Sequence, residues 1–207
     1  MFEAEVITPE LAVYHQKRLA QFTAENTSIP PGGIVFVGDS ITEFFPLKKY
    51  LGRELPLINR GIAGTDTGWL LAHMDEQILA LSPSKIFLMI GINDLGMGYS
   101  VADTVGKIAE LVSQLRLMAC QADIYVISVL PVNEAPAFSK TVKIRNNRDI
   151  QALNSALENL PGLEFINLYS LFLNDEQQLS LESTTDGLHL SQLAYQRLAD
   201  TLRPYLT

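Results

Sequence analysis

The sequence predicts an α/β fold built on a parallel sheet. Five short apolar runs rich in β-branched residues are too short for helices and too apolar for half-exposed strands, which is typical of buried parallel strands. Segments with helical periodicity lie between these runs, which implies right-handed crossovers with helices on both faces of the sheet. We therefore expect a three-layer α/β/α, flavodoxin-like arrangement with a five-stranded parallel sheet. The expected strands are residues 34–37, 56–59, 85–90, 124–130 and 163–168.

The clearest expected helix covers residues 101–120, where apolar residues recur at steps of three and four and form one stripe. Ser100 precedes this stripe as a candidate N-cap. A second helix is expected over residues 67–81, because Pro83 blocks its continuation. Further helices are expected around residues 9–26, 146–160 and 191–205.

The length and composition favour one folded domain. The chain has 207 residues, of which 47% are hydrophobic and 18% charged, enough to fill a single core. No internal repeat, low-complexity tract or linker divides it. We expect one domain over residues 1–207, with residues 1–30 as an N-terminal helical segment packed on it.

The charge balance is acidic, with 15 Lys and Arg against 23 Asp and Glu and a net charge of −8. Such a surface repels phosphate backbones, so we expect no nucleic-acid partner. The N-terminus carries charge throughout and no apolar stretch reaches membrane-spanning length, so we expect neither a signal peptide nor a membrane span. Cys120 is the only cysteine, which favours a reducing, cytoplasmic location, and its place on the apolar stripe predicts a buried thiol.

Polar residues follow the expected strands. Ser40 comes after the first strand, Gly64 after the second, Asn93 after the third, and Asp186 and His189 after the last. The carboxyl ends of parallel strands meet at one edge of a sheet, where reactive groups gather. We therefore expect these residues to lie close together.

The residue types at this edge suit nucleophilic catalysis. A serine hydroxyl is a poor nucleophile until a neighbouring base takes its proton. Of the three histidines, His15 and His73 lie within expected helices, whereas His189 follows a turn and is the natural base for Ser40. Asp186, three residues before His189, can hold the other ring nitrogen, as a triad requires.

A tetrahedral intermediate also needs hydrogen-bond donors aimed at its oxyanion. The backbone N–H groups of Ser40 and Gly64 and the side-chain amide of Asn93 could supply three such donors.

Four short motifs in order resemble the sequence blocks of a known enzyme family. They are Gly-Asp-Ser after the first strand, Asn-Arg-Gly-Ile-Ala-Gly after the second, Gly-Ile-Asn-Asp after the third and Asp-Gly-Leu-His near the end. The chain resembles the SGNH/GDSL hydrolases, also called GDSL-like lipases/acylhydrolases, over nearly its whole length. Within that family it is most similar to the branch of the platelet-activating-factor acetylhydrolase catalytic subunits.

The resemblance implies that Ser40, Gly64, Asn93 and His189 are the residues that give the family its name, with Asp186 completing the triad. It also implies a serine esterase that works through an acyl-enzyme on a small-molecule ester, without metal or cofactor. Acetyl or short-chain acyl esters, carbohydrate esters and lysophospholipids all remain open as substrates, and so does a homodimer.

Several other residues have two interpretations. Phe44, Phe45 and Trp69 could line an acyl pocket or belong to the core. Asp39 is expected to bond local backbone amides, and Asp94 is expected to be structural or pocket-lining rather than a second acid. The basic cluster after the fourth strand is expected to be a solvated face. It consists of Lys140, Arg145 and Arg148.

Three competing functions fit the sequence less well. A flavodoxin-like module that binds a nucleotide or flavin is disfavoured because Asp39 and Glu43 would oppose a phosphate, and no glycine-rich phosphate motif is present. An α/β-hydrolase is disfavoured because Thr42 stands where its nucleophile elbow requires glycine. The complete set of expected residues argues against an inactive relative.

Overall fold

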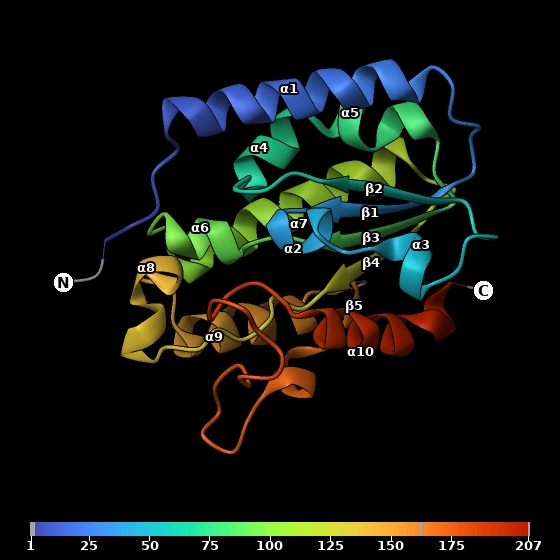
Figure 1. The fold of residues 1–207 in the computed structure, drawn as a ribbon. Helices are drawn as coiled ribbons and strands as arrows, with labels where there is room; N and C mark the ends of the chain where they lie inside the picture. Colours follow the sequence, from blue (N-terminus) through green and yellow to red (C-terminus); the bar gives the residue numbers. More distant parts are fainter. Residues whose placement is uncertain (1–2, 162, 207) are drawn as a thin grey trace.

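The chain folds around a five-stranded parallel sheet with strand order β2-β1-β3-β4-β5 (Figure 1). The structure is a computed structural model that describes residues 3–161 and 163–206. This order is the flavodoxin-like one, and it confirms the α/β fold predicted from the sequence. The strands are β1 (Ile34–Gly38), β2 (Leu57–Gly61), β3 (Lys85–Met89), β4 (Asp123–Ile127) and β5 (Glu164–Ile166).

All five expected strands are present, although β3 ends one residue earlier than predicted and β4 and β5 are each shorter than predicted. After β4 the backbone leaves the sheet because the N–H groups of Val129 and Val132 donate to the side-chain oxygens of Asn154 and Asn147. Both asparagines belong to α9 (Asn147–Glu158). An apolar run that continues beyond its strand thus contacts a helix instead of another strand, and sequence pattern alone cannot distinguish the two.

Helices cover both faces of the sheet, as a buried parallel sheet requires. One face, which includes Val35 and Val37, packs against α4 (Thr67–Ala72), α5 (Met74–Gln77), α7 (Val101–Met118) and α9. The other face, which includes Ile34 and Phe36, packs against α2 (Ser40–Glu43), α3 (Leu47–Tyr50) and α10 (Gln192–Leu202). The remaining short helices, α6 (Ile92–Gly96) and α8 (Ser139–Val142), lie at the carboxyl end of the sheet (Figure 1).

Most of the expected helices form, and their caps are visible in the sequence. α1 (Pro9–Asn26) has the predicted bounds, and the Ser100 side chain caps α7 as expected. Two expectations are wrong. The helix expected over residues 67–81 is divided into α4, α5 and a 3-10 turn (Leu79–Leu81), because the backbone leaves helical geometry at His73 and again at Ile78. Cys120 lies beyond the end of α7 and is exposed rather than buried.

The N-terminal segment crosses a large part of the molecule. α1 packs along α5, and the residues before it run from its first turn past α6 towards α8 (Figure 1). The Glu5 N–H donates to the Gly96 carbonyl oxygen at 2.6 Å, which attaches this stretch to α6. Among the residues described, no helix is both long and apolar enough to cross a bilayer.

Candidate active site

Ser40 lies where β1 ends and α2 begins. Asp39 is the N-cap of α2, and its carboxylate accepts a hydrogen bond from the Ile41 N–H at 3.0 Å. The prediction that Asp39 bonds local backbone amides is therefore confirmed. Burial raises the pKa of Asp39 to about 6. As the first residue of a helix, Ser40 has a backbone N–H without a partner inside that helix.

Asp186 and His189 are held by a compact loop, residues 184–189, which we call the base loop. One oxygen of Asp186 accepts from the backbone N–H groups of Leu188 and His189, at 3.1 and 2.8 Å. The other oxygen lies 2.7 Å from the His189 Nδ1. Burial would raise the pKa of Asp186, but these hydrogen bonds hold it below its ordinary value. The Thr184 hydroxyl closes the loop by donating to the His189 carbonyl oxygen.

The base loop places the His189 imidazole next to the Ser40 hydroxyl. His189 Nε2 lies 2.9 Å from Ser40 Oγ, although the two residues are 149 positions apart. With Nδ1 on the Asp186 carboxylate, Nε2 of a neutral ring is free to accept the serine proton. The structure therefore brings Ser40, His189 and Asp186 together in one hydrogen-bonded line.

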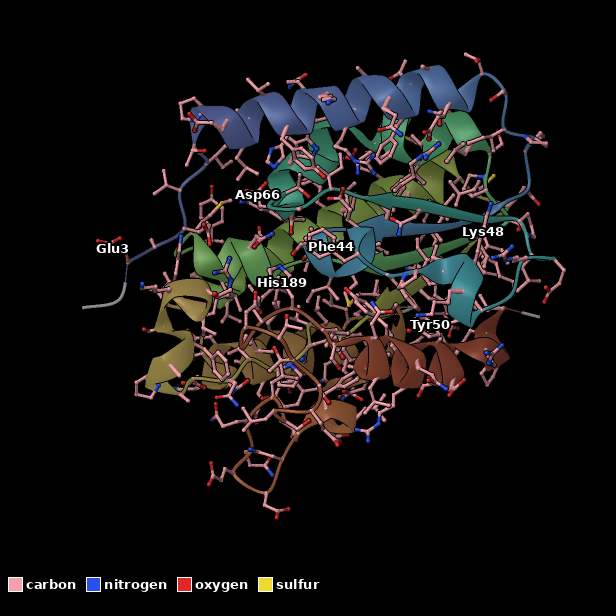
Figure 2. The ribbon with its side chains drawn as sticks, in the orientation of Figure 1. Glu3, Phe44, Lys48, Tyr50, Asp66 and His189 are labelled. Atoms are coloured by element: carbon pink, nitrogen blue, oxygen red, sulfur yellow. The ribbon has the colours of Figure 1, made fainter. Side chains whose placement is uncertain are left out.

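The three candidate pocket residues have different locations. Phe44 is 50% exposed and its ring centroid lies 5.5 Å from that of His189, so it flanks the candidate site (Figure 2). Phe45 is a core residue that packs against Phe36 and Tyr195. Trp69 packs between the rings of His15 and His73, which places it in the contact between α1 and α4. Only Phe44 keeps the position expected of a pocket residue.

The backbone around Gly64 is shaped by α1. Gly64 has φ +81°, and a Cβ there would lie 2.9 Å from Leu11 Cδ2, so glycine is needed both for its backbone conformation and for space. Nε2 of His15 lies 2.9 Å from the Ala63 carbonyl oxygen. Burial lowers the pKa of His15, which favours a neutral ring that donates this hydrogen bond. The sequence places His15 only within an expected helix, and the structure shows that its side chain is buried under this loop.

Glu43 connects the loop after β1 to the loop after β2. One of its oxygens accepts from the Ala63 N–H at 2.6 Å. Its other oxygen accepts from the Tyr14 hydroxyl and pairs with Arg18 Nε at 3.1 Å. Burial and the hydrogen bond to Glu43 raise the pKa of Tyr14 to about 12. Tyr14 and Arg18 of α1 thus position the Glu43 carboxylate, which in turn binds the backbone N–H of Ala63, the residue before Gly64.

Asn93, at the start of α6, is oriented from two sides. Its Nδ2 donates to the Thr65 carbonyl oxygen at 3.0 Å, which places Asn93 beside the Gly64 loop. Its Oδ1 accepts from Arg145 Nη2 at 2.8 Å. The expectation that Arg145 belongs to a solvated face is wrong: it is 3% exposed and bonded inside the site. In the sequence, Arg145 is one of several basic residues near the start of the helix expected over residues 146–160, and this position does not distinguish a buried arginine from an exposed one.

The other residues left open are structural or exposed. The Asp94 carboxylate accepts from the Thr67 N–H and hydroxyl, at 3.0 and 2.9 Å, and burial raises its pKa to about 6. Lys140 and Arg148 are exposed, as expected. Within residues 3–161 and 163–206, no group of three or more His, Cys, Asp or Glu side chains is arranged to hold a metal ion.

A serine, histidine and aspartate aligned at the carboxyl edge of a flavodoxin-like sheet is the arrangement of a serine hydrolase. Comparison with known proteins identifies the family. The chain belongs to the GDSL-like lipase/acylhydrolase family, whose model matches residues 36–197. It is accordingly a hydrolase that acts on esters.

Relatives of this chain include animal enzymes. It is 27% identical over 175 residues to the platelet-activating factor acetylhydrolase IB subunit alpha2 of Gallus gallus, covering 82% of this chain and 73% of the relative. It is 24% identical over 190 residues to the alpha1 subunit of Bos taurus, covering 90% and 79%. The similarity to the acetylhydrolase catalytic subunits expected from the sequence is therefore confirmed.

Solved structures show the same fold. A Streptococcus pneumonia protein named provisionally as a platelet activating factor has a TM-score of 0.89 and 33% identity, covering 95% of this chain and 94% of that one. An acetylxylan esterase from Geobacillus stearothermophilus has a TM-score of 0.60 and 21% identity, covering 84% and 94%. At that identity the second likeness concerns the fold alone.

Proposed function

We propose that this protein hydrolyses carboxylic esters through an acyl-enzyme formed on Ser40, with His189 as general base and Asp186 as the residue that orients the imidazole. The observation that carries the proposal is the line of contacts from Ser40 Oγ to His189 Nε2 at 2.9 Å and from His189 Nδ1 to Asp186 Oδ2 at 2.7 Å. Each distance lies within hydrogen-bond range, as the transfer of the Ser40 proton to His189 and the orientation of the imidazole by Asp186 require.

The reaction follows from these contacts in two halves. Ser40 Oγ attacks the ester carbonyl carbon while its proton passes to His189 Nε2. The tetrahedral intermediate collapses when His189 returns that proton to the leaving alcohol, and the acyl group remains on Ser40. A water molecule then attacks the acyl-enzyme with His189 again as base, which releases the acid and restores the serine. The Asp186 carboxylate stabilises the imidazolium that forms in each half.

The proposed oxyanion donors are the backbone N–H groups of Ser40 and Gly64 and the Nδ2 amide of Asn93. An amide nitrogen carries two hydrogens, and the bond to the Thr65 carbonyl oxygen uses one of the two on Asn93. The second hydrogen is available to a substrate oxygen. Because Asn93 bonds directly to the Gly64 loop, its amide and the Gly64 N–H belong to one connected unit.

We propose an acetyl or other short acyl ester as the substrate class. The support is the similarity to the acetylhydrolase subunits of Gallus gallus and Bos taurus, and the position of Phe44, whose half-exposed ring lies beside that of His189. The alcohol part, carbohydrate or lysophospholipid, is set by loops around the site and is the part that differs most among proteins of one fold.

A panel of p-nitrophenyl esters tests both statements. The acyl chain is varied from acetyl to decanoyl, and kcat/KM is measured for the wild-type protein and for Ser40→Ala. We expect kcat/KM to be highest for the shortest acyl groups and to be lost in the variant. Equal hydrolysis by wild type and variant would disprove the nucleophile, whereas a preference for long chains would disprove only the substrate class.

A further inference from the structure

Arg145 is buried at the edge of the candidate active site and uses its donors on groups around Asn93. It lies between α8 and α9, and its Nε donates to the Ile92 carbonyl oxygen at 3.0 Å. Its Nη2 donates to Asn93 Oδ1 at 2.8 Å. Gly96 makes room for the guanidinium, because a Cβ there would lie 2.3 Å from the Arg145 Cζ. The side chain is thus built into the structure.

The contact between Arg145 and Asn93 fixes which way the Asn93 amide faces. A guanidinium only donates hydrogen bonds, so the atom of Asn93 that faces it must be the oxygen. The amide nitrogen then faces the opposite side, where it donates to the Thr65 carbonyl oxygen. If the amide turned over, its NH₂ group would meet the guanidinium and its oxygen would meet a carbonyl. Both contacts would then be repulsive.

A second charged residue holds Arg145. The Glu5 carboxylate accepts from Arg145 Nη1 at 3.2 Å and from Lys143 Nζ at 2.7 Å. A buried guanidinium without a counter-charge is costly, so Glu5 stabilises Arg145 in this position. Glu5 is itself attached to α6 through the bond from its N–H to the Gly96 carbonyl oxygen. The N-terminal segment therefore reaches Asn93 through one intermediate side chain.

We propose that Arg145 is a positioning residue that sets the direction of the Asn93 amide for the oxyanion, and that Glu5 holds Arg145 in place for this task. The inference rests on the proposed function, since it takes Asn93 as an oxyanion donor. All three guanidinium nitrogens of Arg145 bond to protein groups, and the proposal assigns this residue no contact with the substrate. Its effect on turnover must then pass through Asn93, and this makes the proposal testable by a double-mutant cycle.

The cycle uses the wild-type protein, Arg145→Met, Asn93→Ala and the double variant, with kcat and KM measured on p-nitrophenyl acetate. Arg145→Met should lower kcat about tenfold or more with little change in KM, as for an interaction made in the transition state. The loss should not exceed that of Asn93→Ala, because the Thr65 carbonyl still restrains the amide. In the Asn93→Ala background the same change should cost less than about twofold.

Three further variants separate positioning from folding. Arg148→Met removes the same charge from an exposed site three residues away and should leave kcat unchanged. Arg145→Lys keeps a charge but not the planar fork, so it should recover part of the kcat that methionine loses. Glu5→Gln removes the counter-charge but leaves the guanidinium in place, so it replaces Arg145→Met in the cycle if that variant does not fold. It should lower kcat in the protein that has Asn93 and not in the Asn93→Ala background.

An equal loss of kcat from Arg145→Met in both backgrounds would overturn the proposal, and so would no loss in either. If Arg145→Met does not fold, an equal loss from Glu5→Gln in both backgrounds has the same meaning. Normal turnover in Asn93→Ala would instead overturn the proposed oxyanion role of Asn93 and, with it, this inference. If Asn93→Ala lowers kcat strongly and Arg145→Met has little further effect on kcat in the Asn93→Ala background, both the oxyanion role of Asn93 and the positioning role of Arg145 are supported.

Discussion

The two halves of the candidate active site are held by different parts of the chain. On one side, the base loop holds Asp186 and His189 through contacts among residues no more than five positions apart. On the other side, Gly64 and Asn93, which we call the oxyanion side, depend on residues from distant segments. These are Leu11, His15, Glu43 and Arg145, with Glu5 behind Arg145.

Because of this difference, we expect the two halves of the site to respond differently to substitutions. Most of the hydrogen bonds that shape the base loop lie within it, and the Asn133 N–H, which donates to the Gly187 carbonyl oxygen at 2.8 Å, attaches the loop to the rest of the molecule. The oxyanion side requires the N-terminal segment, α1 and the stretch between α8 and α9 to be correctly packed. We therefore expect variants far from Ser40 in sequence to affect oxyanion stabilisation more readily than proton transfer.

The largest effect is expected from the nucleophile and the base. Ser40→Ala and His189→Ala should each lower kcat by ~10⁴–10⁶, and combining them should add little, because the two residues act as a unit. Asp186→Asn should cost about 10⁴, since the imidazole loses the partner that fixes its tautomer. Steady-state kinetics on p-nitrophenyl acetate gives kcat for the wild type, the three single variants and the double variant. Additive losses would show that Ser40 and His189 do not act together.

A smaller effect is expected on the oxyanion side. Asn93→Ala should lower kcat by ~10²–10³ with KM little changed, as for the loss of one oxyanion donor. Asn93→Asp tests donation from this side chain more specifically, because it keeps the shape of the side chain but replaces the NH₂ donor with an oxygen. Both variants are assayed on the same ester. Full activity in Asn93→Asp would be incompatible with donation from this side chain.

A change at Gly64 tests whether α1 supports the oxyanion side. Gly64→Ala places a Cβ against Leu11 in a backbone region that alanine avoids, so we expect kcat to fall about tenfold and the free energy of unfolding by ~1–3 kcal/mol. Gly68→Ala in α4 is the matched control, because a Cβ there has no neighbour nearer than 3.6 Å. Chemical denaturation and kinetics measure both. If the two variants behave alike, α1 does not restrain this loop.

The last expected effect is on stability alone and depends on pH. Burial raises the pKa of Asp39 from its ordinary value of 3.8 to about 6, so the folded state binds a proton more tightly than the unfolded state. Its contribution to stability is thus present below about pH 4 and is lost as pH rises through about 6. Asp39→Asn keeps an oxygen for the Ile41 N–H, and relative to wild type it should gain ~1–3 kcal/mol between pH 4 and 7.

The control for this measurement is Asp175→Asn, at an exposed loop position. Unfolding free energies are compared at pH 4, 5.5 and 7. The difference between Asp39→Asn and wild type should grow with pH, whereas that for Asp175→Asn should stay flat. A difference for Asp39→Asn that shrinks as pH rises would mean that the folded protein favours the charged carboxylate.

The difference between the base loop and the oxyanion side also explains which features could be predicted from the sequence. The strands, α1 and α7 follow from apolar periodicity and from caps such as Ser100, which are local signals. Asp186 and His189 are adjacent to a turn that the sequence also displays. Ser40, Gly64 and Asn93 were found because each follows a strand, and parallel strands end at one edge.

The supports of the oxyanion side were not predictable in this way. Arg145 has the same local context as Arg148, yet one is buried and the other exposed. His15 lies in a helix with a weak apolar face, and its burial depends on a loop 48 residues away. Likewise, no proline or glycine in the sequence marks the point near His73 where the helix is interrupted. These features depend on tertiary contacts, which a pattern in one segment does not encode.

The central claim is that His189 activates the hydroxyl of Ser40, and covalent labelling tests it most directly. The protein is incubated with a fluorophosphonate, and the modified residue is located by mass spectrometry of its peptides. The account predicts one adduct on Ser40 in the wild type, none on that peptide in Ser40→Ala, and a rate at least about 10³-fold slower in His189→Ala. Labelling of Ser40 at the wild-type rate in His189→Ala, or no labelling of the wild type, would contradict it.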